Sequence, residues 1–395
     1  MSASDSKLDK LAWSLPWLMR YPFWRAREFA GRSAAEKNAP QHLIFIVANH
    51  FEPAWNEQGT PLDWNAQLTG LDRWCEQARG IGLAVRDADG TPFRHTNFYP
   101  AEQYHPRLLQ RLSELQAEGF GEVEVHLHHG IEKPDTPENL RRTLVEFRDA
   151  LADEHQCLSR LDDKGSPMYA FVHGNLALAN SAGGKFCGVD SEMQILAETG
   201  CYADLTLPSA PDRTQVPRVN AIYQCGHPLH EARPHRTGTS VRVGNRSPQL
   251  PVILTGPLVF NWQRRVRGLP VPRIDEGALV ANQPLDMARL NRWRGARIHV
   301  EGRPEWVFVK LYCHGFFHFD QPSTIGDRIK QFWHEAFEQG ERTGEYKIHF
   351  ATAREAFNMI LAATDGREGA PGLYRDYRLR QIMQRESHRS TGTEG

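Results

Sequence analysis

The sequence predicts an α/β fold with mostly parallel strands, arranged as an open sheet or as a β/α barrel. Apolar runs of strand length alternate with segments of helical periodicity at least five times along the chain, which is typical of parallel α/β proteins. Polar residues, many of them histidines, follow several predicted strands directly. In parallel folds the carboxyl ends of the strands form the functional site, so the same ends are the place to look for chemistry.

Composition limits the class of protein. The chain has 395 residues, of which 40% are hydrophobic and 24% charged, as in a soluble globular protein with one large domain or two ordinary ones. A net charge of −1 gives no general attraction for nucleic acid, and no nucleic-acid partner is expected. The six cysteines are scattered without a C-x-x-C pair, which indicates reduced thiols and a cytoplasmic location.

Residues 1–40 are expected to form an aromatic arm without a clear element. Its apolar segment at 11–19 contains two tryptophans and is too short to span a bilayer. It also lacks the small-residue cleavage site of a signal peptide. The segment either packs on the domain, which we favour, or makes a peripheral contact with a membrane surface. No stretch of about 20 apolar residues occurs in the sequence, so no spanning helix is expected.

The first half of the chain contains three clear strand–helix pairs. The continuous apolar run at 42–48 predicts a fully buried parallel strand. Apolar residues from Trp64 to Ala78 recur at helical spacing, and Gly80 is the expected stop. The further predicted elements are strands at 93–99, 121–127 and 168–172 and helices at 105–118 and 137–155.

The second half is less regular. A short helix capped by Asp190 and ended by Gly200 precedes a strand at 202–207. Residues 208–300 are rich in Pro, Gly and Arg and contain one clear strand candidate at 252–255, so we interpret them as a long insertion within the domain. The last predicted elements are strands at 306–313 and 347–350, a helix at 325–338, and a helix opened by the capping box of Thr352 and Glu355. The predicted domain therefore covers 41–365, and an Arg-rich, loosely packed tail covers 366–395.

Three histidines end the strand that begins at Gly121. Because alternate side chains of a strand share a face, His126 and His128 should point one way and His129 the other. Two imidazoles on one face at a strand end are a plausible start for a divalent-metal site. The alternatives are satisfied core histidines or exposed loop residues.

Several motifs occur in the same order as in a known family, from about His42 to Ala363. They are Ala48-Asn49-His50, Phe98-Tyr99-Pro100 followed by His105-Pro106, His126-Leu127-His128-His129, Glu198 to Asp204, Leu311-Tyr312-Cys313-His314 and Ala351 to Ala356. In this order they resemble the polysaccharide deacetylase family, which belongs to a wider group of glycoside hydrolases and deacetylases with a common barrel. The resemblance implies a distorted (β/α)7-type barrel with a long insertion late in the barrel. It also implies a carbohydrate substrate and a divalent metal, with zinc as the first candidate.

The resemblance also suggests metal ligands. The paired aspartates of the family fall at Asn49, which cannot take a proton, and at His50. The two metal histidines of the family are usually four residues apart, and that spacing from His126 lands on Gly130. The pair would then be His126 with either His128 or His129, and the expected ligands are His50, His126 and His128.

Three further residues are candidates for catalysis. Glu52 could replace the missing base or orient a ligand histidine, and His314 could be the general acid. Asp204 could orient a catalytic histidine. The alternatives are a surface carboxylate, a loop histidine and a backbone hydrogen bond at the barrel rim, respectively.

The candidates for substrate binding also follow strand ends or lie close to them. They are His173, Asn175, His129 and Trp55. His173 could instead be a fourth metal ligand, or it could hold the turn at Gly174 by a hydrogen bond.

The leading functional hypothesis is a metal-dependent hydrolase that removes an N- or O-acyl group from a carbohydrate. A second hypothesis keeps the barrel and makes the protein a glycoside hydrolase, with Glu52 and Asp204 as acid and base. A third is a non-catalytic, degenerate barrel that binds saccharide in polysaccharide assembly, because Asn49 occupies the position of the family base.

Overall fold

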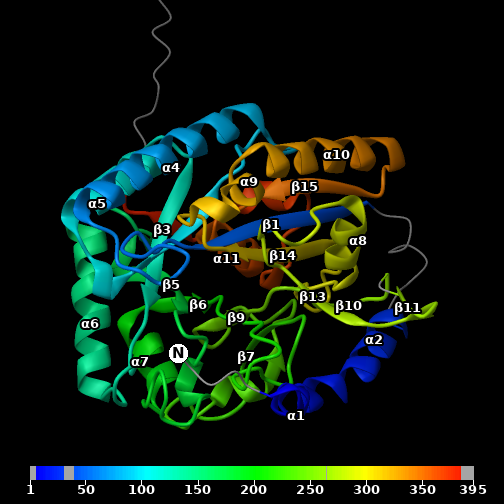
Figure 1. The fold of residues 1–395 in the computed structure, drawn as a ribbon, viewed down its shortest axis with the longest axis horizontal. Coiled ribbons are helices and arrows are strands. Elements are labelled where there is room, and N and C mark those ends of the chain that lie inside the picture. Colours follow the sequence, from blue (N-terminus) through cyan, green and yellow to red (C-terminus); the bar gives the residue numbers. More distant parts are fainter. Residues whose placement is uncertain (1–5, 31–39, 264, 384–395) are drawn as a thin grey trace, which may run out of the picture.

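The computed structural model describes residues 6–30, 40–263 and 265–383, and its centre is a curled sheet (Figure 1). The main path of the sheet runs β14-β1-β2-β3-β5-β6-β9-β7-β8, with β15, β4 and β16 joined at its sides. The strands are β1 (Gln41–His50), β2 (His95–Pro100), β3 (Gly121–Leu127), β4 (Ser159–Leu161), β5 (Lys164–His173), β6 (Cys201–Asp204), β7 (Ile222–Cys225), β8 (Gly238–Ser240), β9 (Val252–Leu254), β14 (Trp306–Cys313), β15 (Tyr346–Phe350) and β16 (Leu379–Gln381).

The prediction of a mixed α/β fold with mostly parallel strands is confirmed, whereas a closed seven-strand barrel is not. Pairing is parallel from β14 through β1, β2, β3, β5 and β6 to β9, and it is antiparallel from β9 to β7 and β8. In the described part of the chain no ladder joins β9 to β14. The two sides approach through the buried Lys310, whose Nζ donates to the Leu205 carbonyl at 2.8 Å.

The helices cover both faces of the sheet. They are α1 (Lys7–Leu18), α2 (Tyr21–Ala30), α4 (Trp64–Ala84), α5 (Pro106–Ala117), α6 (Pro137–Asp149), α7 (Glu192–Thr199), α8 (Met287–Gly295), α9 (Gln321–Thr324), α10 (Asp327–Thr343) and α11 (Ala353–Thr364). Leu43, Phe45 and Val47 of β1 pack in one core with α4, α5, α6 and α10. Ile44 and Ile46 pack in a second core with α11. We call these two sides of the sheet the α4 face and the α11 face.

Local sequence signals explain most helix ends. The capping box of Thr352 and Glu355 opens α11 as predicted, and all twelve residues of that helix are buried. Gly200 ends α7 in the left-handed region at φ 101°. Gly80 does not end α4, because Ile81 and Gly82 are still buried in the core and the helix continues to Ala84.

Over residues 6–30 the N-terminal arm is more ordered than predicted, and residues 1–5 and 31–39 of the arm lie outside the described residues. A capping box between Ser6 and Asp9 opens α1. Trp17 is fully buried in a small core and stacks on Phe260 with ring centroids 5.6 Å apart. The expectation of an arm without elements is therefore wrong, whereas its packing on the domain is observed. Pro16 lies inside α1 and hid the helix in the sequence pattern.

The predicted insertion at 208–300 contributes to the sheet. Its expected strand is β9, which pairs with β6, and β7 and β8 extend the sheet beyond it. The rest forms α8 and two hairpins, made of β10 (Leu258–Asn261) with β13 (Arg273–Glu276) and of β11 (Arg265–Val266) with β12 (Leu269–Pro270).

The tail after residue 366 is packed over its described part, contrary to the prediction. β16 pairs with β4, and the backbone carbonyl of Leu379 accepts a hydrogen bond from Arg354 at 2.9 Å. Arg354 is buried and its Nη2 lies 2.8 Å from Glu122 Oε1 on β3. Residues 384–395 of the tail lie outside the described residues.

All six cysteines lie within the described segments, where they are buried and unpaired. No helix in residues 6–30, 40–263 or 265–383 has the length and hydropathy needed to cross a bilayer.

The buried pair of Arg354 and Glu122 gives a stability prediction. The substitution Arg354→Met removes one partner and leaves Glu122 charged in the core, so the free energy of unfolding should fall by about 3–5 kcal/mol. Urea denaturation measures this change. The control is Arg380→Ala, because Arg380 pairs with Asp163 at an exposed site and its loss should cost less than about 1 kcal/mol. Equal losses in the two variants would contradict the assignment.

Candidate functional site

Side chains from three strand ends meet on the α11 face. In the parallel ladders His50 pairs with Phe98, and Phe98 pairs with Glu124, so these residues share one face of the sheet. Two residues further along β3, His126 continues on the same face. His50, Glu52, His126, His128 and His314 together are called the strand-end cluster below.

The rings of the strand-end cluster are in contact. The ring centroid of His50 lies 4.9 Å from that of His126 and 4.8 Å from that of His314. The ring centroids of His126 and His128 are 4.7 Å apart. Ligand atoms of His50, Glu52 and His126 all lie within 4.8 Å of one another. The structure therefore brings two of the three expected histidine ligands together with Glu52.

The contact between His126 and Glu52 points to a cation. His126 Nδ1 lies 2.8 Å from the Val172 carbonyl, which can only accept, so Nδ1 carries a proton. His126 Nε2 lies 3.2 Å from Glu52 Oε1. If the His126 imidazole were neutral, the lone pair of its Nε2 would face a lone pair of Glu52 Oε1. Either a second proton or a metal ion must lie between these atoms, and a backbone acceptor on the far nitrogen is the arrangement that holds metal-bound histidines.

The pKa values of Glu52 and His50 favour the protonation states of metal ligands. Burial alone would raise the pKa of Glu52, but the hydrogen bond from His126 and the charges of neighbouring histidines lower it to about 2. Burial, together with repulsion from His314 and His126, lowers the pKa of His50 well below its usual range. An ionised carboxylate and a neutral imidazole are the forms that bind metal.

His128 lies at the edge of the cluster. Its Nδ1 is 2.6 Å from Glu102 Oε1, and its Nε2 is 3.6 Å from Glu52 Oε1. Burial lowers the pKa of His128, but the hydrogen bond and charge of Glu102 outweigh it and raise the pKa. The close approach of β5 requires Gly174, since a Cβ there would lie 2.3 Å from the His128 ring.

A pocket of about 290 Å³ opens beside the cluster. Its lining residues are His50, Gly174, Leu176, Thr206, Pro208, Ser209, Ala210, Glu276, Tyr312 and His314. Tyr312 donates a hydrogen bond to Glu276 at 2.8 Å, and burial raises the pKa of Glu276. His50 and His314 thus face a cavity with several polar groups.

Asn49 joins neighbouring segments by hydrogen bonds. It is fully buried, and its Oδ1 accepts a hydrogen bond from the Gly315 amide at 2.7 Å while its Nδ2 donates to Asn97 at 2.9 Å. It therefore ties the end of β1 to the loop that carries His314. Because it alternates with His50, its side chain points away from the strand-end cluster.

Asp204 is buried away from the pocket. It accepts hydrogen bonds from the amide and the hydroxyl of Thr206 at 3.2 and 2.7 Å. Thr206 Oγ1 in turn accepts from the His173 amide at 2.9 Å. Asp204 thus supports the local backbone, and no catalytic histidine lies among its hydrogen-bond partners in the described residues.

The four candidates for substrate binding lie outside the pocket lining. His129 and His173 are buried on the α4 face, with ring centroids 4.9 Å apart. Asn175 is half-buried beyond the end of β5. Trp55 is 40% exposed and forms a bridge with Pro61.

Sequence reasoning missed Glu102, Glu276 and Tyr312. Tyr312 precedes His314 by two residues and therefore shares its side of the strand, a signal that strand alternation could have supplied. Glu102 follows the end of β2 within the short helix Ala101–Gln103. Glu276 lies in the Pro- and Gly-rich region, where no periodicity marks it.

Comparisons of the chain with protein-family models, with curated proteins and with solved structures found no match. The resemblance to polysaccharide deacetylases therefore depends on the sequence motifs alone.

The buried carboxyl of Asp204 gives a pH prediction. Burial raises its pKa from 3.8 to about 7, so the folded state binds this proton more tightly than the unfolded chain. Its contribution to stability is full below the unfolded pKa and is lost as the pH rises to about 7. Relative to Asp204→Asn, the wild-type free energy of unfolding should fall by about 2 kcal/mol between about pH 5 and pH 7. Parallel pH profiles from denaturant titrations of the two proteins would refute this.

Proposed function

We propose that this chain is a metal-dependent hydrolase that acts on a carbohydrate and removes an N- or O-acyl group. The observation that supports it best is the 3.2 Å approach of His126 Nε2 to Glu52 Oε1, next to His50, which lines the pocket. The family resemblance supplies the substrate class and the bond.

Two imidazoles and one carboxylate are a suitable ligand set. His50, His126 and Glu52 offer the His₂Glu combination that catalytic zinc sites use with a fourth position left open. When bound, a divalent ion would polarise the acyl carbonyl and lower the pKa of a water molecule. In this proposal Glu52 is a ligand rather than the general base, because its Oε1 lies 3.2 Å from His126 Nε2, compared with 3.6 Å from His128 Nε2.

The general base is then His128. Glu102 accepts from its Nδ1 at 2.6 Å, which fixes the ring and leaves Nε2 to accept the proton of the attacking water. His314 lines the pocket beside His50, with ring centroids 4.8 Å apart, and would donate a proton to the leaving group. Phe317 stacks on its ring with an interplanar angle of 5° and holds its orientation.

The pocket suits polar, hydroxylated ligands. Thr206, Ser209 and Tyr312 contribute hydroxyl groups, and Glu276 contributes a carboxyl. The glycoside hydrolase alternative is weaker, because Asp204 accepts a hydrogen bond from Thr206 and does not line the pocket.

Metal content and activity test the proposal together. We expect His126→Ala to lose one equivalent of bound divalent metal and to reduce acetate release from acetylated saccharides by at least about 100-fold. Elemental analysis and an acetate assay on the purified chain measure these effects. The matched control is His334→Ala, since His334 is exposed on α10 and should change neither value.

Three outcomes would oppose the proposal. The metal assignment fails if the metal-replete wild type and His126→Ala hold equal amounts of metal. Release of reducing sugar without acetate would favour a glycoside hydrolase. Saccharide binding without turnover on a full panel of acylated sugars would favour the non-catalytic barrel.

The role of His314 is tested through the leaving group. A general acid matters most when the leaving group is poor, so His314→Ala should lower kcat about 100-fold for an N-acetyl sugar and less than about tenfold for an aryl acetate. Steady-state kinetics on both substrates give the comparison. An equal loss on both substrates would assign His314 to structure or metal binding instead.

A further inference from the structure

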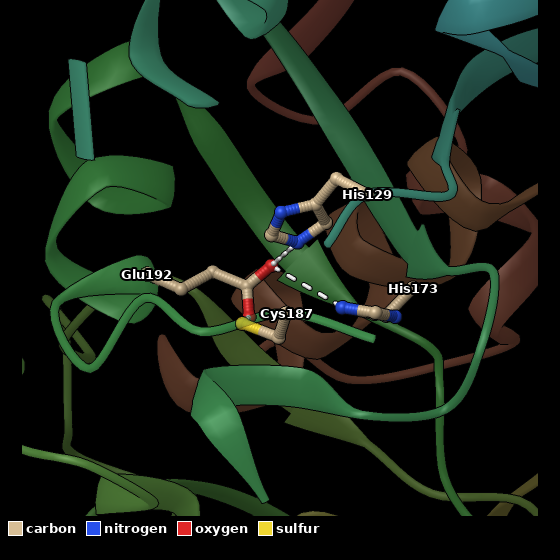
Figure 2. Close-up of side chains that lie close together, drawn as sticks. All are labelled: His129, His173, Cys187 and Glu192. Atoms are coloured by element: carbon tan, nitrogen blue, oxygen red, sulfur yellow. Dashed lines mark hydrogen bonds and ion pairs between the residues drawn. The ribbon is translucent and has the colours of Figure 1, made fainter. Parts of the chain in front are cut away.

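A second cluster lies on the α4 face, behind the strand-end cluster. His129 follows β3 by two residues, His173 ends β5, Cys187 lies in the loop between β5 and α7, and Glu192 is the first residue of α7 (Figure 2). All four residues are buried. They are called the buried cluster below.

The distances in the buried cluster are close to those expected around one metal ion. Metal–ligand bonds of about 2.0–2.3 Å in a tetrahedron place the ligand atoms about 3.3–3.8 Å from one another. Glu192 Oε1 lies 3.1 Å from His129 Nε2 and 3.8 Å from His173 Nε2. Cys187 Sγ lies 3.4 Å from Glu192 Oε2, and ligand atoms of all four residues lie within 4.8 Å of one another.

The two histidines of the buried cluster differ in their hydrogen-bond partners. Asp135 Oδ2 lies 3.0 Å from His129 Nδ1, so a carboxylate holds this ring from behind, as it does at many zinc sites. His173 Nε2 is buried without a hydrogen-bond partner, and Figure 2 shows it pointing toward Glu192. A buried polar atom without a partner is costly, and a metal ion would satisfy it.

We propose that His129 Nε2, His173 Nε2, Cys187 Sγ and the Glu192 carboxylate bind one divalent ion of the zinc class in a closed, structural site. Four protein ligands leave no open position, as in structural rather than catalytic zinc sites. Binding releases the thiol proton of Cys187 and the proton through which His129 Nε2 donates to Glu192. It also moves the His173 proton from Nε2 to Nδ1, which gives up one long hydrogen bond from the Asn175 amide at 3.3 Å.

The proposed ion would stabilise the loop that carries Cys187. Leu176, Ala179, Asn180 and Phe186 all have positive φ between 49° and 62°, a conformation that persists only where surrounding contacts impose it. The loop also supplies Gly174 and Leu176 to the pocket beside His50. An ion in the buried cluster would therefore stabilise one wall of that pocket.

A third group of possible metal ligands differs from the buried cluster, because an arginine pairs with its carboxylates. Asp87, Asp89 and His349 are also close together, but Arg375 pairs with both carboxylates at 2.9 and 3.0 Å. A cation of the protein already balances their charge. No Lys or Arg ion pair with Glu192 occurs among the described residues.

Cobalt substitution of the full chain tests the buried site. A thiolate bound to Co²⁺ gives a sulfur-to-metal charge-transfer band in the near ultraviolet, which histidine and carboxylate ligands do not give. We expect this band in the wild type and in His126→Ala, and its loss in Cys187→Ala together with one equivalent of metal. Cys157→Ala is the matched control, because Cys157 is buried in the core and donates to the His155 carbonyl; it should keep the band.

The same experiments separate the two sites. If the strand-end site fails, His126→Ala and the wild type hold equal metal while the cobalt band remains. The buried site is refuted if the wild type shows no thiolate band, or if Cys187→Ala folds and keeps it.

A measurement on the wild type alone covers the case in which Cys187→Ala does not fold. Alkylation followed by peptide mass spectrometry should show at least a tenfold rise in labelling of Cys187 after chelation, with Cys157 unchanged. Unchanged labelling of Cys187 would also refute the site.

Discussion

The alternation of side chains at the end of β3 determines where the histidines of both clusters lie. Leu127 separates His126 from His128, and His129 follows them on the other side of the strand. Alternation therefore sends two imidazoles to the α11 face and one to the α4 face. A one-residue change of register would move each of these imidazoles to the opposite face, so the pairing of β3 with β2 and β5 is the constraint on which both clusters depend.

The two clusters have similar ligands and different surroundings. In each, a carboxylate oxygen lies about 3 Å from an imidazole Nε2, with Glu52 facing His126 and Glu192 facing His129. The strand-end cluster borders a pocket, whereas the buried cluster contains a cysteine and is enclosed by α7 and its loop. Open and closed coordination separate catalytic from structural metal ions, and this difference assigns the two proposed roles.

The sequence predicted the parts of both clusters that depend on local pattern. Strand alternation correctly separated His126 and His128 from His129, and strand ends correctly brought His50 and His314 together. Glu192 could not be paired with His129 in this way, because 63 positions separate them and the intervening loop has no periodicity. The distorted (β/α)7-type barrel is not confirmed, and the sequence could not decide it: β9 reaches the sheet from a region without a regular pattern, and nothing in the sequence fixes how it meets β14.

The backbone between the clusters links them physically. The Gly174 amide donates to the Leu127 carbonyl at 2.8 Å, which joins the end of β5 to the end of β3 between the two faces. His173 on one side of this bond belongs to the buried cluster, and Gly174 on the other side makes room for the His128 ring. Because a Cβ at position 174 would lie 2.3 Å from the His128 ring, a displacement of His173 that shifts Gly174 would change the space available to His128. Order in the buried cluster is in this way a condition for the geometry of the strand-end cluster, although no side chain belongs to both.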